Sequence, residues 1–218
     1  MTSTTPHAHS VCPMPSPLRY DLKLWLASRG RVRAFRERQL DLANLTAGES
    51  VLDIGCGTGT LAIAAARRVG TTGAVIGVDP SPDLLARARK KARRARVDAT
   101  FEQAGGEKLP FPDASFDLVL STLVFHHLPH DVLRSSAEEI RRVLKPGGRL
   151  LAVDIGGPQD DDKRTMHAPQ GHHVHFDLDA IGERLPDVGL DVVETGPIES
   201  GMRRLERLRY VLASRGTP

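Results

Sequence analysis

Three glycines at alternate positions, Gly55, Gly57 and Gly59, follow a short apolar run in the segment VLDIGCGTG. Such a run is typical of a buried parallel strand. Glycine has no Cβ atom, so the backbone after this strand can turn tightly and lie close to a ligand. The alanine-rich stretch Leu61 to Val69 predicts a helix after the turn. The pattern therefore indicates a strand, a tight turn and a helix that together can hold a small molecule.

An acidic residue stands at the end of the next apolar run. This run, Ala74 to Val78, is followed by Asp79, twenty residues after Gly59, and then by Pro80. A carboxylate at the end of a second strand can accept hydrogen bonds from both ribose hydroxyls of a nucleoside. The chain thus contains the pattern of one half of a nucleoside-binding α/β unit.

The glycine spacing distinguishes between cofactors. Dinucleotide folds require Gly-x-Gly-x-x-Gly, with the pyrophosphate at the helix N-terminus, whereas this chain has Gly-x-Gly-x-Gly. Asp53, just before the turn, would repel a phosphate and attract an ammonium group such as that of a methionyl ligand. The spacing therefore favours S-adenosylmethionine over NAD or NADP.

Length and composition indicate one soluble globular domain. The chain has 218 residues, of which 40% are hydrophobic, and its formal net charge is +3. We find no uninterrupted apolar stretch of about 18 residues and no signal-peptide pattern, so we expect no membrane partner. Cys12 and Cys56 are the only cysteines, which makes a structural disulfide improbable and fits a reduced, cytoplasmic location.

A basic run, Arg87 to Arg96, raises the question of a nucleic-acid partner. The same stretch fits an amphipathic helix whose Leu84, Leu85 and Ala88 face the sheet while the charges stay in water. Charge runs are usually solvated helix faces, so we favour that interpretation and expect no nucleic-acid partner.

The chain divides into a leader and a single domain. Residues 1–17 are polar and proline-rich and predict a flexible leader. Residues 18–218 form the predicted domain, in which 18–45 show helical spacing with a break near Ser28 to Gly30, indicating a cover of two helices. Downstream, patterns predict five strands and two helices: strands Ala99–Gln103, Phe116–Ser121, Arg149–Ile155, Leu190–Thr195 and Arg207–Ala213, and helices Asp131–Lys145 and Phe176–Leu185, the first ended by Pro146-Gly147-Gly148. Alternating strands and helices imply a parallel sheet covered on both faces.

Five segments, VLDIGCGTG, VDPSPDLL, EKLPFPDASFDLVLS, FHHL and RVLKPGGRLL, occur in the order found in one family. With them the chain, from about Leu40 to Ala213, resembles the class I S-adenosylmethionine-dependent methyltransferases, and among these the ubiquinone/menaquinone-biosynthesis-like (methyltransferase type 11) small-molecule group. The resemblance implies a Rossmann-like, doubly wound sheet of seven strands, mostly parallel with the last strand antiparallel and helices on both faces. The cofactor would lie across the carboxyl ends of the first, second and fourth strands.

The resemblance also implies a set of cofactor-binding residues. In this chain they are Asp53, Gly55, Cys56, Gly57, Gly59, Asp79, Pro80, Leu84, Gly106, Glu107, Ser121 and Thr122. The glycines would approach the methionyl and ribose parts, Asp79 would bind the ribose, Leu84 would cover adenine, and Ser121 with Thr122 would border the methionine tail. Gly59 has an alternative role in helix–strand packing, and Leu84 an alternative role in the core.

The chain departs from the family at the adenine edge. Family members have Gly-Asp-Ala-Glu before Leu-Pro-Phe, with the Asp at the adenine amino group, whereas here AGGEKLPF begins at Ala104 and places Gly105 at the acid. Backbone groups around Gly106 and Glu107, or the Glu107 side chain, would then bind adenine. If nothing replaces the acid, Gly105→Asp tightens cofactor binding; if Gly105 has positive φ or touches adenine, the same change weakens it.

Two histidines follow the fourth strand, where the family places the donor methyl group. Methyl transfer from a sulfonium is an in-line displacement that works mainly by alignment, so no catalytic side chain is obligatory. His126 or His127 could act as a base toward the acceptor, or either could be an ordinary loop histidine. A second cluster, His167, His172, His173 and His175, matches no zinc signature, and we expect no metal there. The segment either contacts the acceptor or is a solvated loop.

The leading hypothesis is methyl transfer to a small organic acceptor at oxygen, nitrogen or carbon. An RNA-directed methyltransferase is an alternative, but the chain has neither an Asn/Asp-Pro-Pro-Tyr/Phe motif nor a Pro-Cys nucleophile. A non-catalytic S-adenosylmethionine-binding module is a second alternative, which Asp53 and Asp79 disfavour and Gly105 weakly favours.

Overall fold

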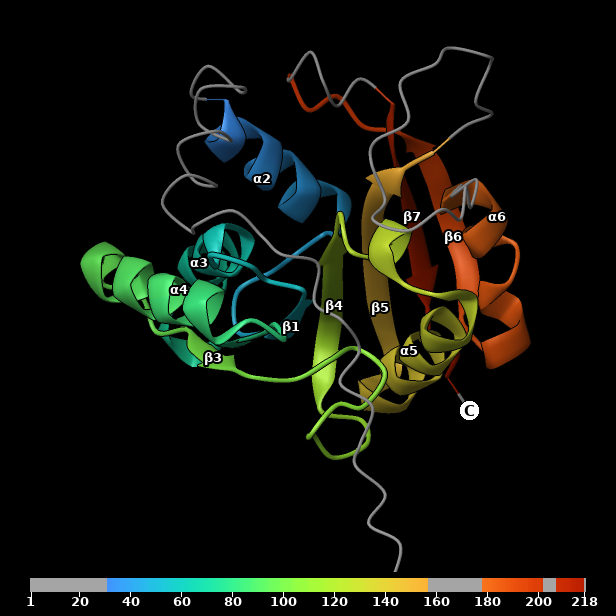
Figure 1. Cartoon of the computed structure of the whole chain (residues 1–218), viewed down its shortest axis with the longest axis horizontal. Coiled ribbons are helices and arrows are strands. Elements are labelled where there is room, and N and C mark those ends of the chain that lie inside the picture. The colour runs from blue at the N-terminus through green and yellow to red at the C-terminus, as the bar shows by residue number, and fades with distance from the viewer. Residues whose placement is uncertain (1–30, 157–177, 202–206, 218) are drawn as a thin grey trace, which may run out of the picture.

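A seven-stranded sheet with helices on both faces forms the molecule (Figure 1). The structure is a computed structural model and describes residues 31–156, 178–201 and 207–217. Its elements, in chain order, are α2 (Val32–Leu42), β1 (Ser50–Ile54), α3 (Thr60–Val69), η1 (Gly70–Thr72), β2 (Ala74–Val78), α4 (Pro82–Ala95), β3 (Thr100–Glu102), β4 (Phe116–Thr122), η2 (Phe125–His127), α5 (His130–Val143), β5 (Leu144–Ile155), α6 (Leu178–Gly182), η3 (Leu185–Val188), β6 (Asp191–Pro197) and β7 (Leu208–Ser214).

The strand order, β3-β2-β1-β4-β5-β7-β6, confirms the predicted topology. Strands β1 to β5 pair in parallel, and β7 pairs antiparallel with both β5 and β6. Because parallel strands end at the same edge, the carboxyl ends of β1, β2, β4 and β5 are neighbours. The chain reverses its direction of winding between β1 and β4, and open α/β sheets bind their ligands at such a switch point.

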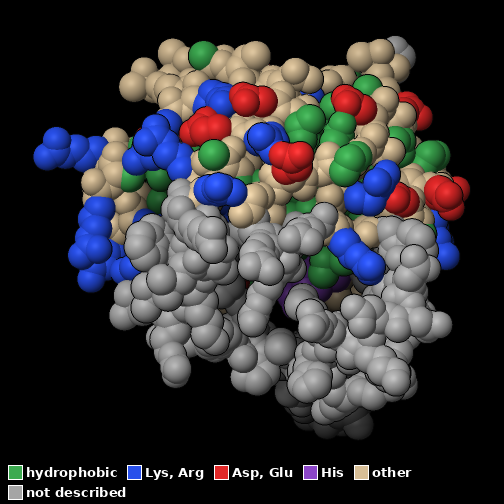
Figure 2. All heavy atoms as spheres, turned by 90° about the horizontal axis from the view of Figure 1, so that it is seen from above, with side chains coloured by type: hydrophobic (Ala, Val, Ile, Leu, Met, Phe, Trp, Pro, Cys, Tyr) green, Lys and Arg blue, Asp and Glu red, His purple; other side chains and the backbone are tan. Residues whose placement is uncertain are grey.

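Side chains alternate between two cores, one on each face of the sheet. Leu118 and Leu120 of β4 join the core that contains α2, α3 and α4, whereas Val119 joins the core that contains α5 and α6. On α4 the buried residues are Leu84, Leu85, Ala88 and Ala92, so its charged side chains occupy the opposite face. Figure 2 shows Lys and Arg side chains gathered at the left, where α4 lies. The amphipathic interpretation of the basic run therefore fits the described helix.

Two predicted boundaries are wrong, because tertiary pairing overrides local signals. Helix α5 ends at Val143 and β5 begins at the next residue, so Pro146-Gly147-Gly148 lies inside the strand. The Gly147 N–H donates to the Arg215 carbonyl, and the Arg215 N–H donates to the Gly148 carbonyl, both at 2.8 Å, with Gly147 at φ +75°. Pairing with the end of the chain thus turns the expected helix stop into an irregularity of the strand, where the β4–β5 register shifts.

The predicted helix Phe176–Leu185 is also wrong in extent. Within the described residues it divides into α6 and η3, because Pro186 stands in the first turn of η3 and cannot continue the backbone hydrogen bonds of α6. The next strand, β6, runs to Pro197, two residues beyond its predicted end.

Several predictions lie outside the described residues. These are the flexible leader 1–17, the first of the two helices in the cover, and the histidine cluster 167–175. Helix α2 is the second predicted helix of the cover. Of the described helices, none has both the length and the apolar character needed to cross a membrane.

Candidate functional site

The three glycines of the turn have positive φ and different surroundings. Their φ angles are +66° at Gly55, +54° at Gly57 and +73° at Gly59, a region that favours glycine. A Cβ atom at Gly55 would collide with Val124, and one at Gly59 would lie 2.8 Å from Phe101. A Cβ at Gly57 would meet no atom within 4 Å. Gly59 therefore serves helix–strand packing, and the open side of the turn is at Gly57.

The Asp79 carboxylate joins the glycine turn to the end of β2. One of its oxygens accepts the Gly57 N–H and the other accepts the Ser81 N–H, each at 2.9 Å. The residue is 7% exposed, and burial raises its pKa above the ordinary aspartate value. Two backbone donors thus hold both oxygens in place beside Gly57, and each oxygen keeps a further lone pair for a ligand hydroxyl.

Asp53 lies behind the turn on the face covered by α3. Its carboxylate accepts the Ala62 N–H at 3.1 Å, and only 2% of the residue is exposed. Burial raises its pKa to about 7, although the nearby Arg36 acts in the opposite direction. The site therefore contains a buried acid that a cationic ligand group would help to ionise.

Cys56 contributes structure to the turn. Its N–H donates to the Val78 carbonyl at 3.0 Å, which ties β1 to β2 at their carboxyl ends. Burial raises the pKa of its thiol, so the thiol stays protonated and unreactive.

Lys91 of the basic helix α4 also contacts the turn. Its ammonium donates to Thr58 at 3.0 Å and to Thr60 at 2.8 Å. The solvated interpretation of the basic run missed this contact.

Helix α2 reaches the site through two side chains that the sequence analysis did not identify. Gln39 is fully buried and donates from Nε2 to the Thr122 hydroxyl at 3.1 Å, while its Oε1 accepts from Arg36 at 2.9 Å. Arg36, Asp53, Gly57 and Thr122 line one cleft, which encloses about 40 Å³. A nucleoside is larger, so it would lie over the rim along the ends of β2 and β3.

Buried hydroxyls mark the opposite face of the sheet. The Oγ atoms of Ser121, at the end of β4, and of Ser136, on α5, are buried without a hydrogen-bond partner in the described structure. A Cβ atom at Gly106 would lie 3.2 Å from the Ser136 hydroxyl and 3.2 Å from Ile54. Buried polar atoms normally have partners, so the two hydroxyls can accept or donate to a bound molecule or water.

In the predicted adenine-edge segment, the Glu107 carboxylate lies against Gly105. A Cβ atom at Gly105 would collide with the carboxylate of Glu107, because that side chain bends back over the Gly105 Cα. The Lys108 N–H donates to the Gly105 carbonyl at 3.4 Å, which closes a turn around Gly106 and Glu107. Gly105 has no positive φ. The Glu107 carboxylate therefore occupies the space that a side chain at position 105 would enter.

Pro80 and Leu84 lie on the outer side of Asp79. The Pro80 carbonyl accepts from Gln103 at 3.0 Å, which links the loop after β2 to the loop after β3. Leu84 is 4% exposed and sits in the first turn of α4, where its N–H donates to Ser81 at 3.5 Å. Both residues thus lie next to the predicted adenine position.

The two histidines after β4 differ in their partners. His126 Nδ1 lies 2.7 Å from Asp154 Oδ1, and the His126 N–H donates to the other oxygen of Asp154 at 3.3 Å. The His127 ring packs against the His126 ring at a tilt of 44°, with 3.8 Å between centroids. Partial desolvation and the adjacent His126 lower the pKa of His127. Asp154 was missed, although an acid inside the apolar strand LLAVDI was a visible signal.

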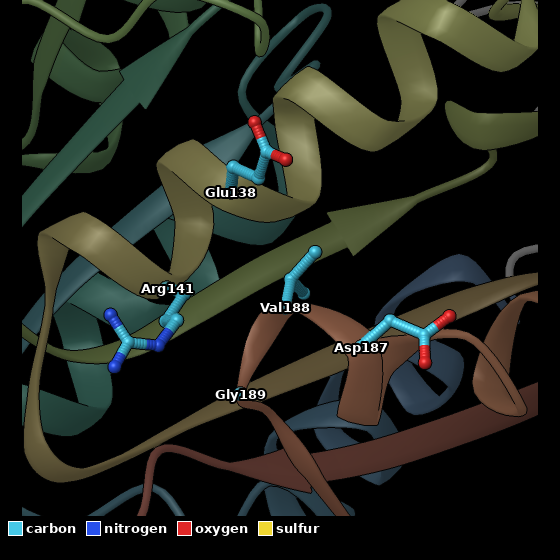
Figure 3. Close-up of a pocket in the computed structure, with 5 residues that line it drawn as sticks. All are labelled: Glu138, Arg141, Asp187, Val188 and Gly189. Carbon is cyan, nitrogen blue, oxygen red and sulfur yellow. The ribbon is translucent and has the colours of Figure 1, made fainter.

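A larger hollow of the described surface lies elsewhere. It has about 400 Å³ and is lined by Glu138, Arg141, Asp187, Val188 and Gly189 (Figure 3). Gly189 precedes β6, whose first residue aligns through Ser214 with Arg149 in the amino-terminal half of β5, so this hollow is at the amino end of the sheet. Ligands of open α/β sheets bind at the carboxyl end, so the chemistry of the glycine turn, rather than volume, identifies the site. Figure 2, which looks onto that edge, shows histidine side chains near its centre.

Comparison with known proteins shows the family of the chain. Residues 51–148 match the model of a methyltransferase domain. The chain is 39% identical to the ubiquinone/menaquinone biosynthesis C-methyltransferase of Pseudomonas putida, with 87% of this chain and 83% of that protein covered. The chain belongs to the class I S-adenosylmethionine-dependent methyltransferases. For the homologous enzyme of Enterobacter sp. (strain 638) the identity is 28%, with coverage of 87% and 85%.

Solved structures agree with the fold of this methyltransferase. An S-adenosylmethionine-dependent methyltransferase from Aquifex aeolicus superposes with a TM-score of 0.72 at 24% identity, covering 93% of this chain and all of that chain. The [4+2]-cyclase SpnF gives 0.71 at 19% identity, covering 85% and 81%. These likenesses show the fold alone. Family membership gives the methyltransferase its cofactor, S-adenosylmethionine.

Proposed function

We propose that this methyltransferase transfers the methyl group of S-adenosylmethionine to carbon in a small hydroxylated organic acceptor. One observation supports the cofactor site above all others, namely the Asp79 carboxylate held by two backbone N–H groups beside the open Gly57. Carbon as the accepting atom is inferred from the relatives, which are C-methyltransferases. We further propose a cytoplasmic location, which the protonated Cys56 thiol fits.

The cofactor residues follow from their positions around the turn. Asp79 would accept both ribose hydroxyls. Pro80 and Leu84 would cover one face of adenine, with Gly106 and Glu107 at its amino edge. These assignments agree with the resemblance found in the sequence, except that the acid at the amino group is supplied by Glu107 instead of a residue at position 105.

The methionyl group would lie in the cleft between α2 and the turn. Asp53 would attract the ammonium and Arg36 the carboxylate, since both residues line this cleft. Gly55 lets the Val124 side chain pack directly against the turn. Thr122, held by Gln39, borders the same space at the end of β4. The methyl group would then point beyond β4, toward the segment that contains His126.

Such an arrangement works by alignment. The sulfonium is reactive by itself, and in-line displacement requires the acceptor atom to approach the methyl group opposite the sulfur. The binding residues fix the sulfonium, and exclusion of water prevents its side reactions. Turnover therefore depends first on the cofactor residues, and the acceptor is selected beyond β4.

Calorimetry with four ligands tests the cofactor site. We expect binding of S-adenosylmethionine and S-adenosylhomocysteine, and no binding of NAD or NADP. Asp79→Ala should weaken S-adenosylhomocysteine binding by about 1.5–3 kcal/mol, the range for a hydrogen bond to a charged group. Asp83→Ala, an exposed acid on the first turn of α4, is the matched control. Tight NAD binding, or an Asp79 variant with unchanged affinity, would contradict the site.

Two alternatives remain distinguishable. An RNA-directed enzyme would use the basic face of α4 and bind RNA with a steep salt dependence. A non-catalytic module would bind the cofactor and methylate nothing; the cyclase-like fold neighbour illustrates that the fold alone does not specify methyl transfer. A panel of hydroxyaromatic, amine and thiol acceptors with ¹³C-methyl-labelled cofactor separates these cases, because only the proposed enzyme labels a small acceptor.

A further inference from the structure

We propose that His126 is the general base that takes a proton from the acceptor hydroxyl, and that Asp154 is its positioning residue. The proposal rests on the proposed function, because it concerns the acceptor side of the same site. It assigns the base role to one of two adjacent histidines that the sequence alone could not distinguish.

The sheet brings the dyad to the cofactor edge. Strands β1, β4 and β5 are consecutive in the sheet, so the glycine turn after β1 and Asp154 near the end of β5 lie on either side of the segment after β4. Val124 packs on Gly55 at one side of this segment, and His126 bonds to Asp154 at the other. His126 therefore lies just beyond β4, the strand whose end borders the methionyl cleft, and beside the end of β5.

A strained residue starts this segment. Leu123 has φ +59°, a conformation that side-chain-bearing residues rarely adopt, and its N–H donates to the Val153 carbonyl at 2.8 Å. Strain of this kind persists where surrounding structure enforces it, and it is common at functional sites. Here it turns the chain from β4 so that Val124 meets Gly55 and His126 meets Asp154.

Asp154 is built to orient a histidine. It is 1% exposed, and besides His126 its Oδ1 accepts the Ile155 N–H at 2.8 Å. A buried carboxylate on Nδ1 favours the tautomer in which Nδ1 bears the proton and Nε2 the lone pair. Charged or titratable groups near the dyad include His127 and, opposite Asp154 on β7, Arg209, which pairs with Asp179.

The step balances in atoms and electrons. The acceptor O–H bond breaks and its proton moves to Nε2, which leaves an anion delocalised onto a conjugated ring carbon. That carbon bonds to the methyl group as the carbon–sulfur bond breaks, and the electron pair stays on sulfur in S-adenosylhomocysteine. The ring carbon then loses its hydrogen as a proton to water, and the oxygen recovers a proton from the imidazolium. One proton is released to solvent in each turnover.

Nuclear magnetic resonance of ¹⁵N-histidine-labelled protein in its S-adenosylhomocysteine complex tests the dyad without an acceptor. We expect His126 with protonated Nδ1 and unprotonated Nε2, and we expect Asp154→Asn to admit the opposite tautomer, because an amide can donate to Nδ1. A wild-type ring with Nε2 protonated, or a tautomer unchanged in Asp154→Asn, would overturn the proposal.

The pH dependence of methyl transfer to 1-naphthol separates a base from a structural role. At pH 7 we expect His126→Gln to be slower than wild type by about 10²–10⁴-fold, the usual contribution of a general base. At pH 10 most of the naphthol is already ionised, so the difference should fall below tenfold. His130→Gln, the same change at an exposed position at the start of α5, should behave as wild type at both values.

Each outcome has a separate meaning. An equal loss at both pH values in a His126→Gln protein that still binds S-adenosylhomocysteine would overturn the base role. If the wild type binds the cofactor and does not methylate 1-naphthol, the acceptor class of the proposed function is wrong, and the tautomer measurement decides the role of His126 by itself. If no cofactor binds, both proposals fail.

Discussion

Asp53 is a buried acid whose pKa of about 7 leaves it largely protonated in the ligand-free protein below neutral pH. A cationic ammonium favours the ionised form, so binding of S-adenosylhomocysteine should release a proton there. We expect the affinity to fall as pH decreases below 7, by up to about tenfold per pH unit. Calorimetry between pH 5.5 and 8.5, in buffers of different ionisation enthalpy, measures this release.

Two controls isolate Asp53. Methylthioadenosine lacks the amino-acid part of the cofactor and should bind without proton release. Asp53→Asn keeps an acceptor for the Ala62 N–H and should remove the proton release. Because the raised pKa means that this residue's contribution to stability is lost as pH rises toward 7, the same variant should be more stable than wild type at pH 8. Proton release that persists in Asp53→Asn would exclude Asp53 as its source.

The Glu107 carboxylate lies where a side chain at Gly105 would begin, and this changes the expectation for Gly105→Asp. The expected tightening required that no other side chain fill the position, yet a Cβ at Gly105 would meet the Glu107 carboxylate. We now expect Gly105→Asp to give no tightening, because it places two carboxylates together. Glu107→Ala should weaken S-adenosylhomocysteine binding by about 0.5–1.5 kcal/mol, and Gly105→Asp combined with Glu107→Ala should restore it.

The outcome of the double variant decides between a chemical and a backbone role. Recovery of affinity by the double variant shows that the position needs an acid, whichever residue supplies it. If Glu107→Ala binds as tightly as wild type, then backbone groups around Gly106 read the adenine amino group, and Glu107 has no part in binding.

At the scale of elements, α2 is fastened to the end of β4 by one buried amide. Gln39→Leu would leave the Thr122 hydroxyl without its amide donor and would remove one acceptor of Arg36. We expect a loss of about 1–3 kcal/mol in the free energy of unfolding, together with weaker cofactor binding, because α2 positions Arg36. Urea unfolding and calorimetry measure the two effects, with the exposed Arg33→Gln of the same helix as control.

A pure stability loss would contradict this account of α2. If Gln39→Leu unfolds at lower urea concentration but binds S-adenosylhomocysteine as wild type does, then α2 covers the sheet without shaping the methionyl cleft. If neither the free energy of unfolding nor the affinity changes, the hydrogen bonds of the Gln39 amide contribute no more than the packing of a leucine does.

Local patterns predicted the elements whose signals lie within them. Hydrophobic periodicity predicted α4 and the apolar run predicted β4, because the buried residues of each element recur at regular intervals within its own sequence. The stop signal Pro146-Gly147-Gly148 misled, since its effect depends on pairing with Arg215 at the far end of the chain. An element boundary that depends on pairing with a residue far away in the sequence cannot be predicted from the neighbouring residues alone.

At the scale of the whole molecule, the residues of the candidate site also divide into those that the sequence predicted and those that it missed. The order of strands and acids along the chain predicted that Asp53, the glycines and Asp79 meet at one edge. Arg36 and Gln39 were missed because a polar residue in a helix shows its burial only once the helix is docked. Asp154 was missed as a partner of His126 because the two residues are 28 apart in the sequence and come together only when β4 pairs with β5.

The different surroundings of the three glycines predict which of them would change first during evolution. Gly59 is required by Phe101 and Ala88, which would press on any Cβ there, so every lineage that keeps this packing retains it whether or not a ligand binds. Gly57 faces open space, and its positive φ also suits asparagine. Relatives that abandoned the cofactor should therefore have drifted first at Gly57 and last at Gly59, so a pseudoenzyme of this lineage would still display two of the three glycines.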